Sequence, residues 1–271
     1  MIRIFSFIGS MAGEKSSTAR SSDELASVVS EMAKKQGEEV SYERMTGKDV
    51  RVDYCLSCSS CFRKGVCPLD SRDDMAMLKK KMSECDILFV GSPVYIGDMS
   101  GLMKSVMDRI SYWAHRYELA GKPAAVFAVT DSSHGQETAE RMSDALNYTG
   151  LLTVHTGYAR RGMHMHPNLY LETDMGPIWQ EAAEKLLCAL RSPASFVTEL
   201  DELKFRTRKV LAKRALKYAE VTGIAAWDEC VVLQARGMTK AETYAEYLNG
   251  LEDLLPMRGG SAGDRMETEG R

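Results

Sequence analysis

The chain has 271 residues, 44% hydrophobic and 27% charged, a composition typical of a soluble globular protein with enough apolar material for a sizeable core. Lys and Arg number 35 against 38 Asp and Glu, so a net charge of −3 gives no general basic surface for nucleic acid or anionic lipid. The sequence contains no run of 18 apolar residues, and its N-terminal segment lacks the pattern of a signal peptide. We therefore expect a cytoplasmic protein that uses neither a membrane nor a nucleic acid as partner.

Short apolar segments rich in β-forming residues occur through the first two thirds of the chain. The segments expected to be strands are Ile2–Ile8, Glu39–Arg44, Asp86–Ser92, Ala124–Thr130 and Leu152–Tyr158. The third and fourth are almost continuously apolar, which is typical of strands buried on both faces of a parallel sheet.

Helical patterns separate these strands, at 17–36, 73–82, 101–113 and 136–148. Five strands with interposed helices predict an α/β fold. The spacing favours a doubly wound, five-stranded parallel sheet in the flavodoxin-like strand order 2-1-3-4-5.

The strand signals end near residue 175, and three further helices are expected at 178–191, 196–222 and 240–255. We divide the chain into a sheet domain (1–191), a helical extension (192–255) and a disordered tail (256–271). The segment Lys204–Lys217 carries seven basic residues, a pattern that fits contact with RNA, a membrane or an acidic partner. Nearby acidic residues favour the simpler interpretation, the solvated face of a packed helix.

The first strand leads into a loop that is rich in hydroxyls and ends at a helix. Free N–H groups and the positive end of the helix dipole make such a turn an anion site. Glu14 separates Gly13 from Lys15, so the loop is not a Walker A motif, and it lacks the dinucleotide pattern Gly-x-Gly-x-x-Gly. It suits the phosphate of flavin mononucleotide (FMN), held by Ser10, Ser16, Ser17 and Thr18. The alternative is that these hydroxyls only cap the helix.

Two further loops follow the third and fourth strands, at the same edge of the expected sheet. Ligands bind at this edge in doubly wound folds. The residues expected to frame a flat ring are Pro93, Val94, Tyr95, Ile96 and Gly97 in one loop, and Thr130, Ser132, Ser133, His134 and Gly135 in the other. Ordinary strand-to-helix turns remain the alternative. His164 and His166 are expected to be solvated loop residues.

Four of the seven cysteines, Cys55, Cys58, Cys61 and Cys67, lie within thirteen residues. An odd total without a secretion signal argues against a disulfide framework and suggests metal or redox chemistry.

Several of these motifs resemble a known family. Ser92-Pro93-Val94-Tyr95, followed by Gly101-Leu102-Met103-Lys104 and Met107-Asp108-Arg109, resembles the NADPH-dependent FMN reductases of the flavodoxin-like superfamily. The motif Cys55-x2-Cys58-x2-Cys61-x5-Cys67, followed by Asp73-Asp74-Met75, resembles the iron–sulfur flavoprotein branch.

The resemblance covers roughly residues 1–190. It implies FMN across the three loops, a [4Fe–4S] cluster on the cysteine motif, NAD(P)H as electron donor, and dimers or tetramers. The first loop departs from the family's usual Gly-Ser-Pro-Arg and lacks the phosphate-facing Arg, which predicts weaker phosphate binding unless Lys15 supplies the charge.

Four thiolates are what a [4Fe–4S] cluster requires, and the overlapping Cys-x2-Cys pairs suit it better than the separated pairs usual for zinc. Zinc and free thiols remain alternatives. The expected function is that of an FMN-dependent oxidoreductase or electron-transfer flavoprotein, whose flavin carries the chemistry and whose partner is a small-molecule or redox-protein donor or acceptor. The alternatives are a cluster-free NAD(P)H-dependent reductase of flavin, quinones or nitro compounds, and a non-catalytic partner-binding protein.

Overall fold

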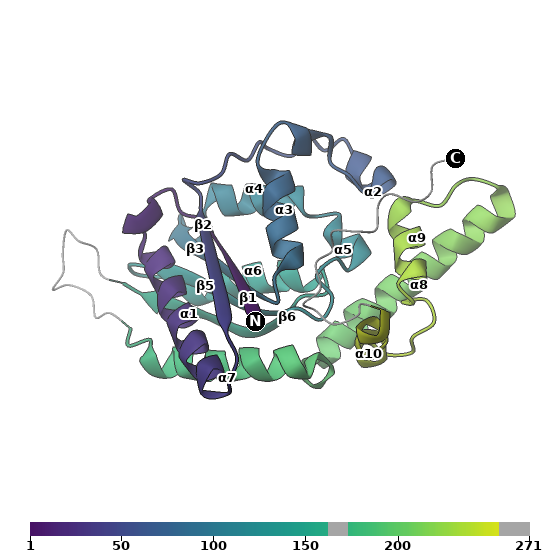
Figure 1. The fold of residues 1–271 in the computed structure, drawn as a ribbon. Coiled ribbons are helices and arrows are strands. Elements are labelled where there is room, and N and C mark those ends of the chain that lie inside the picture. The colour runs from purple at the N-terminus through teal and green to yellow at the C-terminus, as the bar shows by residue number, and fades with distance from the viewer. Residues whose placement is uncertain (162–172, 255–271) are drawn as a thin grey trace.

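The structure is a computed structural model that describes residues 1–161 and 173–254. Its centre is a parallel sheet in the order β2-β1-β3-β5-β6 (Figure 1). These strands are β1 (Ile2–Ile8), β2 (Val40–Thr46), β3 (Ile87–Tyr95), β5 (Pro123–Thr130) and β6 (Leu152–Arg160). They correspond to the five predicted segments, and their order is the predicted 2-1-3-4-5. The doubly wound, flavodoxin-like α/β fold is therefore confirmed.

The sheet also has a sixth strand that the sequence did not predict. β3 continues past its expected end at Ser92 to Tyr95 and turns back into the two-residue β4 (Asp98–Met99), which is antiparallel to it. Ile96 and Gly97 occupy the turn with φ of 52° and 74°, the left-handed values of a tight hairpin turn. A two-residue strand is too short to show a period of alternating residues, so the sequence pattern does not reveal it.

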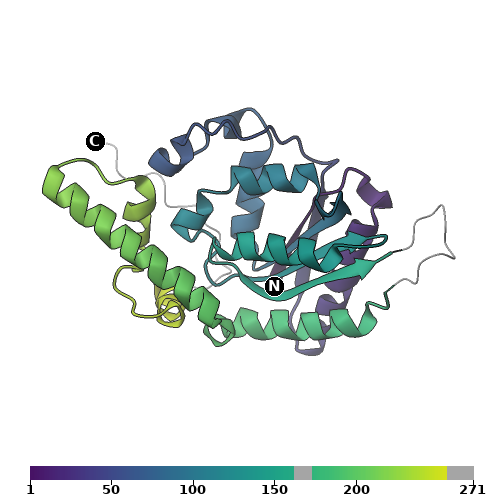
Figure 2. The same cartoon turned by 180° about the vertical axis from the view of Figure 1, so that it is seen from behind.

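Helices cover both faces of the sheet, as Figures 1 and 2 show. One face packs against α1 (Ser17–Lys35) and α7 (Gly176–Arg191), and the other against α3 (Met75–Glu84), α4 (Gly101–Arg109) and α6 (Gly135–Asn147). The apolar residues of the third and fourth predicted strands are buried on both sides, which explains why those segments read as continuous apolar runs.

The helix expected at 101–113 is interrupted. α4 ends at Arg109, and a separate short helix, α5 (Trp113–Arg116), follows after a turn. Ile110, Tyr112 and Trp113 are all buried. On one straight helix these three side chains would point in different directions, so the turn lets all of them enter the core.

The extension consists of η3 (Pro193–Phe196), α8 (Glu199–Thr222), α9 (Asp228–Ala235) and α10 (Tyr244–Leu254). α8 begins three residues later than expected, because Thr198 and Asp201 form a capping box at its start. α9 was not predicted from the sequence. Phe205, Leu233 and Tyr244 form an apolar cluster with Tyr117 of the sheet domain, which joins extension and sheet domain.

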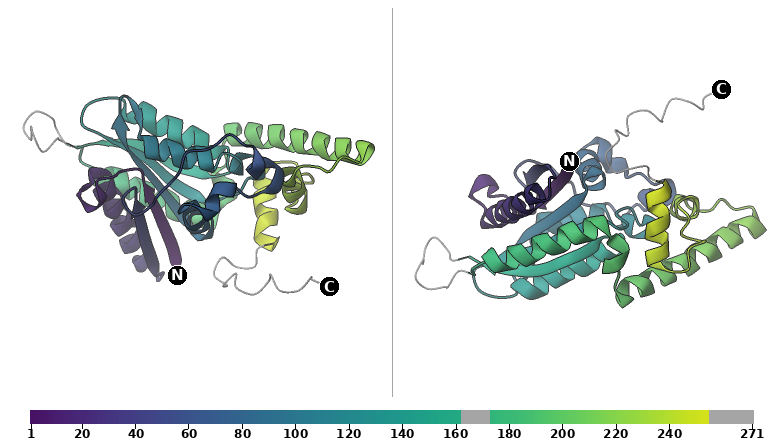
Figure 3. Two further views of the ribbon diagram at one scale, coloured as in Figure 1. Left: turned by 90° about the horizontal axis from the view of Figure 1, so that it is seen from above. Right: turned by 60° about the horizontal axis from the view of Figure 1, so that its bottom comes forward.

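Figures 2 and 3 show that the far end of α8 projects away from the sheet domain. In the part of the chain that the structure describes, no helix has the length and apolar character needed to cross a membrane. The predicted tail at 256–271 lies outside the described residues.

His155 on β6 gives the fold a pH dependence that can be measured. Its ring packs against Trp179 with centroids 5.5 Å apart, and burial, followed by the charge of Lys185, lowers its pKa from 6.5 to about 4. Below pH 6.5 the unfolded chain binds a proton that the folded chain accepts only near pH 4, so stability falls as the pH drops through this range. His155→Gln should remove about 2 kcal/mol of this fall between pH 7 and pH 4.5, as measured by urea unfolding. His134→Gln, at an exposed position, is the matched control, and equal pH slopes for both variants would contradict the assignment.

Candidate functional site

The three predicted loops meet at the edge of the sheet where β1, β3 and β5 end. Ser100, which caps α4, links two of them: its hydroxyl donates to the carbonyl of Gly9 at 2.5 Å, and its N–H donates to the hydroxyl of Ser92 at 2.9 Å. This buried pair of hydrogen bonds fixes the end of β3 against the end of β1. The structure therefore brings the first two loops together, as the predicted strand order requires.

The first loop contains a short 3-10 helix, η1 (Gly13–Lys15), before α1 begins. The hydroxyl of Ser16 accepts from the N–H of Ala19 at 3.3 Å, so Ser16 has the capping role that was the alternative to phosphate binding. Ser10 and Thr18 are buried. The N–H groups of Ser17 and Thr18, in the first turn of α1, have no carbonyl partner within the helix and are free to donate to an anion.

Lys48, which the sequence analysis missed, lies over this loop. Its Cδ is 3.1 Å from where a Cβ would stand on Gly13. The N–H of the preceding Gly47 donates to the carbonyl of Ser10 at 2.9 Å, which holds the segment after β2 against the loop. The signal was available, because in the order 2-1-3 the end of β2 lies beside the end of β1. The aliphatic part of the Lys48 side chain therefore packs against the loop that lacks the family's usual Arg.

The second loop presents apolar groups to solvent. Tyr95 is 59% exposed and Ile96 is fully exposed, whereas Pro93 and Val94 are half-buried. Arg141 donates to the carbonyl of Gly97 at 2.6 Å, which ties the hairpin turn to α6. A rigid turn with an exposed aromatic side chain is a suitable surface for a flat ring.

The third loop is polar and lies against the second. Thr130 accepts from the N–H of Ser132 at 3.2 Å and donates to the carbonyl of Ser133 at 2.9 Å. The exposed His134 has a φ of 60° and lies against Gly97, about 3.5 Å from where a Cβ on that glycine would stand. Gly135 is required by packing, because a side chain there would collide with the ring of Tyr158.

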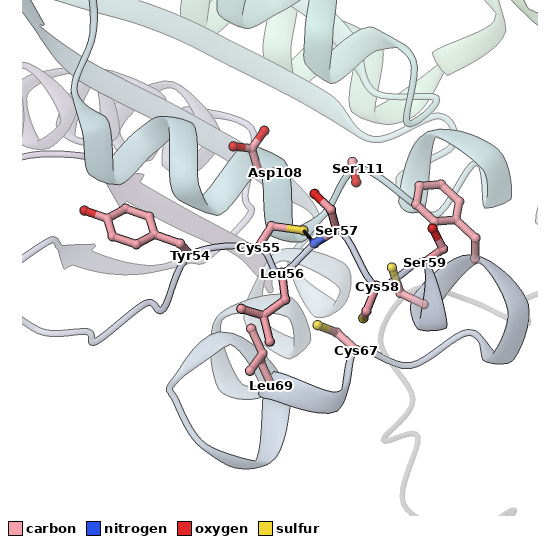
Figure 4. A pocket seen from close by; sticks show the side chains of 12 residues that line it. Tyr54, Cys55, Leu56, Ser57, Cys58, Ser59, Cys67, Leu69, Asp108 and Ser111 are labelled. Carbon is pink, nitrogen blue, oxygen red and sulfur yellow. Dashed lines mark hydrogen bonds between the residues drawn. The ribbon is translucent and has the colours of Figure 1, made fainter.

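The four predicted cysteines line one cavity of about 450 Å³. The loop that carries them includes α2 (Ser60–Lys64) and ends at the 3-10 helix η2 (Pro68–Ser71). Ser57 and Ser59 have positive φ values of 52° and 56°, which fold the segment between Cys55 and Cys61 back on itself. Figure 4 shows Cys55, Cys58 and Cys67 gathered around the same space.

The thiols differ in their electrostatics. Hydrogen bonds from the backbone and hydroxyl of Ser60 lower the pKa of Cys58. Burial raises the pKa of Cys61, and the nearby sulfur of Cys67 raises it further. Among the described residues, no group of three or more Cys, His, Asp or Glu converges closely enough to hold a single metal ion. The four thiols share the lining of this one cavity.

Arg109, on α4, anchors both ends of the cysteine loop. Its side chain is fully buried and donates to the carbonyl of Asp53, before the motif, at 2.9 Å. It also donates to the carboxylates of Asp70, at 2.9 Å, and Asp73, after the motif. Asp73 accepts in turn from the N–H of Asp53 at 2.9 Å. One guanidinium thus joins the segment before the cysteine motif to the segment after it.

The extension contacts the cysteine loop from the other side. The ring of Phe62, next to Cys61, packs edge-on against His115 at 4.9 Å, and His115 lies 3.1 Å from the carboxylate of Glu229 on α9. Asp228, also on α9, forms an ion pair with Arg116 beside Gly65. Nothing in the sequence spacing indicates these contacts, because the two segments are more than 160 residues apart.

The profile of one protein family, described as NADPH-dependent FMN reductase, matches residues 2–163. The chain belongs to this FMN reductase family. The match covers the sheet, the three loops and the cysteine motif, and it confirms the family that the sequence motifs predicted.

Two curated relatives of this FMN reductase family member are archaeal proteins named iron–sulfur flavoprotein. One, from Archaeoglobus fulgidus, is 34% identical over 110 residues, which is 40% of this chain and 48% of the relative. The other, from Methanocaldococcus jannaschii, is 37% identical over 91 residues, or 33% of this chain and 46% of the relative. The chain thus spans about half the length of each. Among solved structures, the apo form of an NADH:FMN oxidoreductase is 17% identical, covers 73% of this chain and 92% of its own, and has a TM-score of 0.47.

Proposed function

We propose that the protein is an FMN-dependent oxidoreductase that carries a [4Fe–4S] cluster on Cys55, Cys58, Cys61 and Cys67. The observation that carries this proposal is the presence of two separate sites in one sheet domain, three ligand loops at the switch point and a cavity lined by all four cysteines. When bound, the flavin supplies exchange between two-electron and one-electron chemistry, and no side chain is required as a nucleophile.

The residues at the loops fit FMN. The N–H groups of Ser17 and Thr18 and the ammonium group of Lys48 would bind the phosphate, with Ser10 and Ser16 shaping the loop. Tyr95 and Ile96, both exposed, would cover one side of the ring and exclude water there. The polar groups of Ser132, Ser133 and His134 would lie at the ring's edge, where they would orient it and its electron donor.

The cysteine arrangement favours a cluster over zinc. A single zinc ion draws four sulfurs to within about 2.3 Å of one point, whereas a [4Fe–4S] cluster binds each thiolate to a different iron. Four thiols that line one cavity of about 450 Å³ suit the second arrangement. The N–H groups that lower the pKa of Cys58 would also stabilise a ligating thiolate.

We further propose NAD(P)H or a redox protein as electron donor, a small molecule or redox protein as acceptor, and a homodimer or tetramer in the cytoplasm. The family name supports the nicotinamide donor, and the seven cysteines, all free in the structure, support a reducing compartment.

The test is anaerobic purification followed by an ultraviolet–visible spectrum, with iron and acid-labile sulfide assays on the same sample. Flavin bands with about four irons per chain are the expected result. Flavin without iron, before and after reconstitution, would instead identify a cluster-free NAD(P)H-dependent reductase. Absence of flavin affinity would overturn the oxidoreductase proposal.

Lys48→Gln should weaken FMN binding about three- to tenfold, because it removes one charge-assisted contact to the phosphate. Riboflavin, which has no phosphate, is the matched control ligand and should bind the variant and the original chain equally. Fluorescence quenching titrations measure both affinities. Equal loss for the two flavins would mean that Lys48 shapes the loop rather than binds the phosphate.

A further inference from the structure

A nearly buried arginine lies beside the first loop. Arg44 is on β2, which pairs with β1, and its side chain is only 12% exposed. Its Nη2 donates to the carboxylate of Glu14 in η1 at 2.9 Å, and its Nε donates to the carboxylate of Asp23 on α1 at 2.8 Å. One guanidinium therefore joins three elements: the strand β2, the loop that precedes α1, and α1 itself.

Asp23 is itself held by a chain of hydroxyl groups that starts inside the protein. Tyr42 donates to Asp23 at 2.9 Å, so its oxygen is left to accept from Ser22, also at 2.9 Å. The hydroxyl of Ser22 lies 2.7 Å from that of Ser6, and both serines are fully buried. Burial raises the pKa of Tyr42, so its hydroxyl keeps the proton that it donates. The carboxylate that orients Arg44 is thus anchored in the interior.

The loop that Arg44 holds leads directly to the N–H groups assigned to the phosphate. Ser17 and Thr18 follow Glu14 closely in the sequence, at the start of α1. Several N–H groups bind one anion well only when they already point at the same place, because ordering them on binding costs free energy. The path of η1 therefore decides how well Ser17 and Thr18 are placed for a phosphate.

The charges around Arg44 do not by themselves favour an anion. One guanidinium is matched by two carboxylates, Glu14 and Asp23, so the group carries net negative charge. We propose that Arg44 is a positioning residue of the phosphate site, which holds η1 through Glu14 in the arrangement that binds a phosphate. Its contribution is one of geometry rather than of charge. This inference rests on the proposed assignment of the loop to the flavin phosphate.

Arg44→Lys separates geometry from charge, because lysine keeps the cation but cannot donate to Glu14 and Asp23 with the same fixed fork. It should weaken FMN binding about fivefold or more and change riboflavin binding less than about twofold. Glu14→Ala should also weaken FMN binding, about threefold, although it removes a negative charge from the loop. Lys81→Gln is the matched control: it breaks an ion pair with Glu43, the neighbour of Arg44 on β2, and should change neither affinity more than about twofold. Fluorescence quenching titrations with the full chain measure these affinities.

Hydrogen exchange on the flavin-free full chain tests the same role without a ligand. The N–H groups of Lys15 and Ser16 donate to the carbonyls of Ala12 and Gly13, at 3.2 and 3.0 Å. Arg44→Lys should speed the exchange of these two N–H groups about fivefold, and the control variant should not.

Three outcomes would overturn the proposal. They are unchanged FMN affinity in Arg44→Lys, equal weakening of FMN and riboflavin in that variant, and tighter FMN binding in Glu14→Ala, which would show that only charge acts. If the unmodified chain binds no flavin, the flavin assignment fails. The exchange rates then decide separately whether Arg44 holds the loop.

Discussion

Replacing Cys67 by Ser should remove iron and acid-labile sulfide from the anaerobically purified protein and leave the flavin bound. Cys67 is the buried member of the motif, 8% exposed, and lies directly before η2. The expected change is from about four irons per chain to nearly none, because a cluster with three thiolates is easily lost. The flavin loops are built on other elements, so the flavin absorbance should stay.

The matched control is Cys188→Ser, since Cys188 is an exposed cysteine on α7 outside the motif. This variant should keep the full iron content. If the original protein holds iron and Cys67→Ser keeps all of it, Cys67 is not a ligand. If both variants lose iron equally, the loss reflects general damage to the fold rather than removal of a ligand.

Arg109→Leu should destabilise the protein by about 3–5 kcal/mol, the usual cost of removing one partner from a buried ion pair. The variant leaves the carboxylate of Asp73 buried without its cation. The segments before and after the cysteine motif also lose the hydrogen-bond donor that they share. The arrangement also lowers the pKa of Asp73, largely through the hydrogen bond from Arg109, against the cost of burial. Urea unfolding at pH 7 measures the loss.

Lys104→Leu is the control for this prediction, because Lys104 is on the same helix and its ion pair with Asp108 is exposed. It should cost less than about 1 kcal/mol. Arg109→Lys separates charge from geometry: it keeps the cation but cannot reach Asp53, Asp70 and Asp73 together, so it should recover only part of the stability. Full stability in Arg109→Leu would show that the loop is held by other contacts.

The sheet could be predicted from the sequence because burial on both faces leaves long apolar runs, as at 86–92 and 124–130. The three loops could be predicted because strand order alone brings the ends of β1, β3 and β5 together. The cysteine motif could be predicted because its four residues lie close together in the sequence, where their spacing is visible. These features share one property: each depends on neighbouring residues or on the order of strands.

What could not be predicted depends on side chains that meet from distant segments. The sequence does not distinguish Arg109 from other basic residues on helices. Its role follows only from the fold, which places Asp53 and Asp73 beside it. α9 has weak amphipathic character and lies among polar and small residues, so its pattern gives little signal. The role of Lys48 requires knowing that β2 ends beside the first loop. His164 and His166, expected to be solvated, lie outside the described residues.

The contact between α9 and the cysteine loop has a consequence for any shortened form of this chain. The family match ends at residue 163, so the helices after Arg191 could be taken as unnecessary for the cysteine site. However, α9 forms one wall beside Phe62 and Gly65, and cutting the chain at 191 would open that wall to water. Iron content measured on such a fragment would then report solvent access to the cysteines as much as the cysteines themselves.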